Sequence, residues 1–76
     1  MKIKPKLLDV IALLENIPEK KLSSGEIGTI VEQLDDNVYE VEFSDKNGRT
    51  YEMAAIDIEK MLVLQFKEES ILDEII

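Results

Sequence analysis

Two short segments of alternating apolar and polar residues, joined by a glycine-containing turn, constrain the fold of this chain most strongly. Residues 38–43 place Tyr39, Val41 and Phe43 on one face and glutamates on the other, and residues 49–55 alternate in the same way. A period of two residues is typical of a β-strand with one buried face. The two segments therefore predict an antiparallel β-hairpin.

The turn of this hairpin sets which residues face each other. A two-residue loop at Asn47-Gly48 would place Phe43 opposite Glu52, a core residue opposite a solvent residue. A three-residue loop over residues 46–48 instead pairs Phe43 with an aromatic residue and puts Gly48 at the left-handed position that such loops need. We therefore predict the three-residue loop. A one-residue shift would reverse every face, so this register assigns three residues of the second strand to the core: Tyr51, Met53 and Ala55.

Residues 7–14 fit two patterns. Their apolar residues suit the stripe of an amphipathic helix, but they also alternate as in a strand. As a strand, the segment would direct four residues to the core: Leu8, Val10, Ala12 and Leu14. Ile11 and Leu13 would then lie on a second face, which needs cover from the C-terminal segment or from another subunit.

The remaining elements are short. In chain order we expect an exposed loop at 19–24, a strand at 27–34, a turn at 35–37, a 3₁₀ turn within 56–60 and a last strand at 61–66. Gly25 and Gly28 bracket the entry to the strand at 27–34. Glycine there indicates a bulge, a positive φ or a close approach, so both are predicted structural turn residues together with Gly48. No helix follows them, which disfavours a phosphate-binding loop.

Composition limits the class of protein. With 76 residues and 45% hydrophobic content, the chain forms one small domain that must use most of its apolar side chains. It has no cysteine, so disulfides cannot stabilise it, and a reducing compartment such as the cytoplasm fits. The basic start of the chain precedes an apolar run that contains Asp9 and is too short to span a membrane.

The charge disfavours nucleic acid as a partner. Seventeen acidic residues against nine basic ones give a net charge of -8, whereas binding to nucleic acid begins with lysine and arginine neutralising phosphates. We therefore expect no nucleic-acid partner. One stretch is acidic without any basic residue, and it is either a solvated sheet face or a surface for a basic protein partner. Its candidate partner-binding residues are Glu32, Asp35, Asp36, Glu40 and Glu42.

The sequence favours no catalytic, metal or cofactor site. Histidine, cysteine and tryptophan are absent, which removes the commonest general base and the soft metal ligands. The carboxylate pairs, such as Asp57 with Glu59, fall in predicted turns, where burial sufficient to separate their pKa values is not expected. We therefore expect a protein that is not an enzyme and has no cofactor.

The end of the chain carries a second candidate surface. Four apolar residues within the last six stand among carboxylates, and Ser70 followed by Asp73 suggests a capped helix start. A free tail of this kind would expose much apolar surface, so we predict a short helical segment docked in cis or in trans. Its candidate binding residues are Ile71, Leu72, Ile75 and Ile76.

The order of these features is also similar to that of a known family. The residues that carry the resemblance are Leu8-Asp9-Val10-Ile11-Ala12-Leu13, Gly25-x-x-Gly28-Thr29-Ile30-Val31, Val38-Tyr39-Glu40-Val41-Glu42-Phe43, the turn from Asp45 to Tyr51, and Leu62-Val63-Leu64. They resemble a bacterial family of short proteins, common in cyanobacteria and described as a domain of unknown function. The resemblance implies a five-stranded SH3-like barrel related to KOW and Tudor-like barrels, with the first segment as a strand. It also implies an antitoxin-like or accessory half of a two-gene cassette, and it supplies no catalytic residues.

Together these expectations divide the chain into a basic N-terminal arm at 1–6, a barrel at 7–66 and an acidic amphipathic tail at 67–76. The leading functional hypothesis is a protein-interaction module that neutralises a basic partner. The alternatives are an RNA-associated KOW-like barrel, which the charge opposes, and a self-assembling homo-oligomer.

Overall fold

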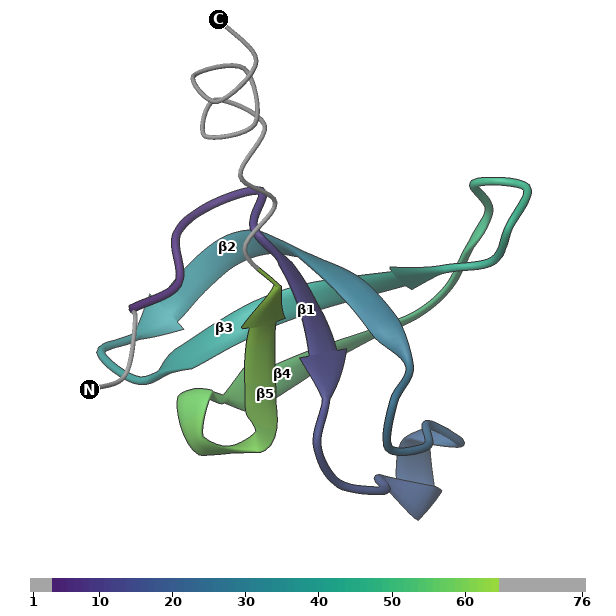
Figure 1. The fold of residues 1–76 in the computed structure, drawn as a ribbon, viewed down its shortest axis with the longest axis horizontal. Helices are drawn as coiled ribbons and strands as arrows, with labels where there is room; N and C mark the ends of the chain where they lie inside the picture. Colours follow the sequence, from purple (N-terminus) through teal and green to yellow (C-terminus); the bar gives the residue numbers. More distant parts are fainter. Residues whose placement is uncertain (1–3, 65–76) are drawn as a thin grey trace, which may run out of the picture.

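The computed structural model describes residues 4–64, which form a mainly β domain (Figure 1). Its elements are β1 (Val10–Leu13), the 3₁₀ turn η1 (Pro18–Lys20), β2 (Ile27–Asp35), β3 (Val38–Ser44), β4 (Thr50–Asp57), the 3₁₀ turn η2 (Ile58–Lys60) and β5 (Met61–Leu64). Five antiparallel strands make one sheet in the order β4-β3-β2-β1-β5. The predicted mainly β class with five strands is confirmed, and the predicted C-terminal helix lies outside the described residues.

The connections explain the strand order. Successive strands from β1 to β4 are neighbours, and η2 then returns the chain so that β5 pairs with the free side of β1. The predicted 3₁₀ turn is confirmed at Ile58–Lys60, where the Asp57 carboxylate accepts a hydrogen bond of 2.9 Å from the Glu59 amide. Such a cap satisfies an amide that the turn leaves free. No helix among residues 4–64 is long and apolar enough to cross a membrane.

The core lies on one face of the sheet and reverses the faces predicted for the first strand. Ile11 and Leu13 are fully buried, whereas Leu8 and Leu14 are exposed. The strand is also shorter than predicted, because a turn at residues 7–8 with Leu8 at φ 72° precedes it. Ile11 and Leu13 bury more apolar area than Val10 and Ala12 would, so they take the inner face.

The β3–β4 hairpin contains the predicted three-residue loop but not the predicted register. The Asp45 amide donates to the Arg49 carbonyl at 2.9 Å, and Gly48 has the predicted positive φ, 81°. Beyond the loop, however, Ser44 pairs with Thr50 while Phe43 pairs with Glu52, so Tyr51 is an extra residue in a β-bulge.

This bulge reverses the faces of β4. Ala54 and Ile56 are buried, and the residues predicted for the core, Tyr51, Met53 and Ala55, are exposed. The physical reason is the size of Ile56, which fills the core better than the alanine beside it. One inserted residue lets the chain keep both the glycine loop and this larger core residue.

The loop predicted as exposed over residues 19–24 contains a core residue. Leu22 is 2% exposed and forms an isolated bridge with Ile17. Lys21 ends η1 in the left-handed conformation, with φ 58°, and this tight reversal brings Leu22 back beneath the loop. The connection from β1 to β2 is therefore anchored to the core.

Candidate interaction surface

The face of the sheet opposite the core, here called the outer face, carries the charged and apolar side chains that do not pack in the interior. Residues directly opposite each other in antiparallel strands share a face. Two rows cross this face by that rule. One consists of Leu62, Ala12 and Ile27, and the other of Leu64, Val10, Thr29, Glu42 and Met53.

Four of the five predicted acidic residues lie on the outer face. Glu40 and Glu42 alternate with the core residues of β3, Glu32 pairs with Glu40, and Asp35 pairs with Val38. We call these four residues, Glu32, Asp35, Glu40 and Glu42, the acidic column. Asp36 lies instead in the β2–β3 turn, where its amide donates to the Asp35 carboxylate at 2.8 Å.

Within residues 4–64, no lysine or arginine forms an ion pair with the acidic column. The ion pairs found there are Lys6–Asp9, Lys20–Glu52 and Lys60–Glu15, at 3.7 to 3.9 Å. Glu42 accepts a hydrogen bond of 2.5 Å from the Thr50 hydroxyl. Glu32 lies directly across from Glu40, an arrangement of like charges that destabilises a sheet.

This pairing predicts that Glu40→Lys stabilises the free protein. The change replaces repulsion from Glu32 with attraction, and we expect the free energy of unfolding to rise by about 0.5 kcal/mol at low salt, with a smaller gain at high salt. Urea unfolding followed by circular dichroism measures it. Glu40→Gln removes only the repulsion, so its free energy of unfolding should lie between those of wild type and Glu40→Lys. A Glu40→Lys variant less stable than wild type would contradict the cross-strand repulsion.

Exposed apolar residues share the outer face with the acidic column. Ile27, Met53 and Leu62 are 48%, 41% and 52% exposed, and we call these three the apolar rim. Met53 is the direct neighbour of Glu42 on the outer face. Sequence reasoning assigned Met53 to the core because the bulge at Tyr51, which turns Met53 outward, has no local signal.

Tyr51 makes a contact between distant segments at the end of the sheet. Its hydroxyl donates to Glu26 Oε1 at 2.5 Å, and Glu26 Oε2 accepts from the Ser23 amide at 2.7 Å. The hydrogen bond to Glu26, followed by desolvation and the negative charges of Glu26 and Asp45, raises the pKa of Tyr51 to about 12. Tyr51 thus joins the hairpin to the start of β2.

The raised pKa predicts a loss of stability at alkaline pH. The folded protein holds the Tyr51 proton more tightly than the unfolded chain, so this contribution is complete below the ordinary tyrosine pKa of about 10 and is lost as pH rises through about 12. Between these pH values, the free energy of unfolding of the wild type should show a decline that the Tyr51→Phe variant lacks. The difference in tyrosinate absorbance between the two proteins should have its midpoint near pH 12, and a midpoint at the ordinary value would contradict the contact.

The three glycines have two different roles. Gly25 and Gly48 lie in turns with φ 95° and 81°. Gly28, also predicted as a turn residue, lies inside β2 and is buried. A Cβ atom there would be 2.5 Å from Val41 Cγ1 and 3.0 Å from the Phe43 ring, so Gly28 permits close packing of β2 on β3.

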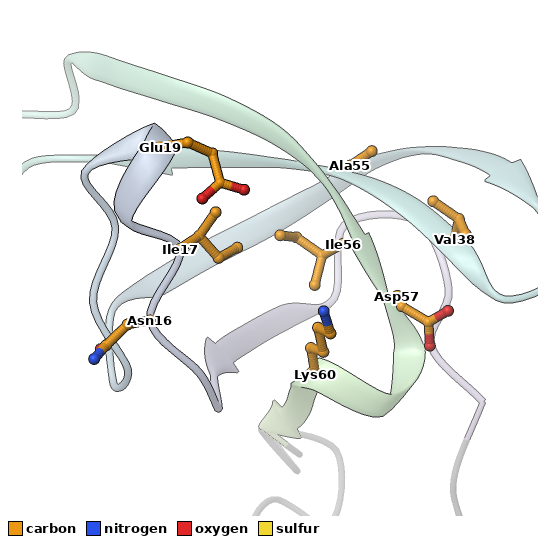
Figure 2. Close-up of a pocket in the computed structure, with 8 residues that line it drawn as sticks. All are labelled: Asn16, Ile17, Glu19, Val38, Ala55, Ile56, Asp57 and Lys60. Atoms are coloured by element: carbon orange, nitrogen blue, oxygen red, sulfur yellow. The ribbon is translucent and has the colours of Figure 1, made fainter.

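A cavity of about 290 Å³ lies at the β4 edge of the sheet, between η1 and the end of β4 (Figure 2). Its lining comes from four segments of the chain: Asn16, Ile17, Glu19, Val38, Ala55, Ile56, Asp57 and Lys60. Sequence reasoning singled out only Asp57 of these, and only as a turn carboxylate. No spacing pattern could have revealed a cavity that forms when separate segments meet.

The described part of the chain shows no arrangement suited to a metal ion. No group of three or more carboxylates among residues 4–64 converges as metal ligands would. The predicted tail residues Ile71, Leu72, Ile75 and Ile76 lie outside the described residues, so their docking stays a prediction.

Comparison with known proteins places the chain in a family. A search of the curated proteins and a search of the solved structures each gave no match. A family model described as "Domain of unknown function (DUF4926)" matches residues 7–63, which include all of β1 to β4 and most of β5. The protein therefore belongs to the DUF4926 family.

Proposed function

We propose that this protein is a non-enzymatic interaction module that binds a basic protein partner through its outer face. The observation that carries the proposal is the acidic column, which forms no ion pair with a basic residue of the described part of the chain and shares the outer face with exposed apolar side chains. Apolar contact supplies affinity, while unpaired charge selects a partner of opposite sign and speeds association. The two features together suit a protein surface better than a surface that only aids solubility.

The size of the surface is compatible with this role. A standard interface buries about 800 Å² on each partner, which is about a seventh of the 5630 Å² accessible surface of this chain. One face of a five-stranded sheet can supply that area. The like charges of Glu32 and Glu40 cost stability in the free protein, and a basic partner would remove that cost on binding.

The bacterial setting implied by the sequence resemblance suggests a more specific partner. An antitoxin-like protein would neutralise a basic enzyme by covering the site that binds phosphates. Glu40 and Glu42 project from β3 about 7 Å apart along the strand, so the column offers regularly spaced negative charges. The absence of cysteine fits action in the cytoplasm.

We further propose that the five strands of the sheet curve into a small SH3-like barrel. Three features support this: the strand order β4-β3-β2-β1-β5, the 3₁₀ turn between β4 and β5, and two irregularities in the pairing of β2 with β3. Bulges of this kind bend a strand and allow it to serve two halves of a barrel.

Affinity capture from cells of the source organism, followed by mass spectrometry, tests the proposed function. Wild type and Glu15→Lys should capture the same basic protein, and Glu40→Lys should lose it. Glu15 is a matched control because it is exposed and outside the outer face, and the charge change is the same. Recovery of RNA and ribosomal proteins would favour the RNA-associated alternative, and recovery of the protein alone, as an oligomer in light scattering, would favour self-assembly.

A further inference from the structure

Within residues 4–64, β4 pairs with no strand on the side away from β3, which faces the cavity. β4 is an edge strand of the sheet, and the Ile58 amide just beyond it donates to the Asn37 carbonyl at 2.7 Å. Antiparallel strands alternate between hydrogen-bonded and non-hydrogen-bonded pairs. Counting back from Ile58, Ile56 and Ala54 bond to β3, whereas Ala55 directs its N–H and C=O away from the sheet.

Lys20 supports this assignment and limits the length of the open edge. Its ammonium group donates to the Met53 carbonyl at 3.4 Å, so Met53, two residues before Ala55, also directs its main chain outward. The same ammonium lies 3.8 Å from Glu52. A lysine in this position protects an edge strand from further pairing. Among the residues that the structure describes, the edge is therefore covered at Met53 and open from Ala55 to Asp57.

The cavity lies along this open part of the edge. Ala55, Ile56 and Asp57 line one side, and Ile17 and Glu19 line the other. Figure 2 shows Ile17 and Ile56 approaching each other across the cavity, with the Lys60 side chain directed toward Ile56. The site thus combines main-chain groups of an edge strand with apolar and charged side chains in its lining.

We propose that this slot accepts an extended segment of a basic polypeptide as an added strand on β4. Main-chain groups at a sheet edge are satisfied by another extended backbone, and a neighbouring pocket holds alternate side chains. Glu19 and Asp57 in the lining favour positive charge, and Lys60, the one basic residue among the described residues of the lining, is 3.9 Å from Glu15. The net charge of -8 favours the same kind of partner. This site lies at the β4 edge of the sheet and meets the outer face at Ala55, which is opposite Glu40.

A defined peptide tests the proposal. The probe is a nine-residue peptide that alternates valine with lysine, with both ends blocked, titrated into ¹⁵N-labelled protein. We expect a dissociation constant below about 1 mM, with the largest amide shifts at Ala55 and Asp57 and slower hydrogen exchange at Ala55. The same peptide methylated on alternate main-chain nitrogens keeps its charge and side chains but cannot form main-chain hydrogen bonds with β4. Its affinity should therefore be lower by about tenfold or more.

Two protein variants complete the test. Lys20→Met keeps the aliphatic stem but uncovers the Met53 carbonyl, so it should bind the peptide about threefold or more tightly. Glu32→Lys, which changes the acidic column on β2 and not beside β4, should leave the shift at Ala55 in place, and this separates the site from the proposed function. Absence of binding at millimolar peptide, equal binding of the methylated peptide, or shifts confined to the acidic column would each overturn the proposal.

Discussion

Gly28→Ala is expected to lower the free energy of unfolding by about 2 kcal/mol, as measured by urea denaturation. Replacing glycine by alanine in a strand normally stabilises it, by roughly 0.5–1 kcal/mol, so the sign of the effect is itself a test. The reason for the reversal is overpacking, since the new methyl group would lie 2.5 Å from Val41 Cγ1. Val41 is fully buried and branched at Cβ, so it cannot rotate away cheaply.

A double variant separates this clash from other effects. Val41→Ala removes the atom that the Gly28→Ala methyl group would meet, so the double variant should lose less stability than the sum of the single variants. We expect a coupling of about 1 kcal/mol or more. Additive losses would show that the Cβ–Cγ1 contact is not the cause, and a stable Gly28→Ala variant would contradict the packing of β2 on β3.

Leu22→Ala is expected to lower the free energy of unfolding by about 3 kcal/mol. Leu22 is 2% exposed and belongs to the core, so its truncation loses transfer free energy and leaves a cavity. A domain of this size has a total stability of only about 5 kcal/mol, which makes the loss a large part of the whole. The chain lacks tryptophan, so circular dichroism is a suitable probe.

Leu8→Ala is the matched control for this substitution. It deletes the same atoms from a leucine that is 74% exposed, and its effect should stay within about 0.5 kcal/mol. If the two variants lost equal stability, Leu22 would not be anchored in the core. If neither lost any, the loop between β1 and β2 would pack differently from the structure.

The local features of the fold were predictable because they depend on neighbouring residues. Alternation in 38–43 and 49–55 was enough to find two strands, and the loop before Arg49 with Gly48 at positive φ followed from the chemistry of short turns. The 3₁₀ turn before the last strand was found in the same way. The acidic stretch was visible as a run of charge, and its alternation with core residues placed Glu40 and Glu42 on one face.

Which face of each strand is buried could not be decided locally. Alternation allows either face of a strand to be the buried one. Which face is buried depends on which large side chains meet across the whole sheet. In β1 this favours Ile11 and Leu13, and in β4 it favours Ile56 at the cost of a bulge. The burial of Leu22 has the same origin, because a reversal of the chain at Lys21 brings it to the core.

The same distinction between local sequence properties and tertiary packing applies to the candidate sites. Sequence alone determined a small, acidic, mainly β protein without histidine or cysteine, since composition and alternation are local properties. Only the tertiary structure decided that Met53 and Ile27 lie outward beside the acidic column. It alone also placed Ile17 against the open edge of β4, because that cavity exists only where segments distant in the chain meet.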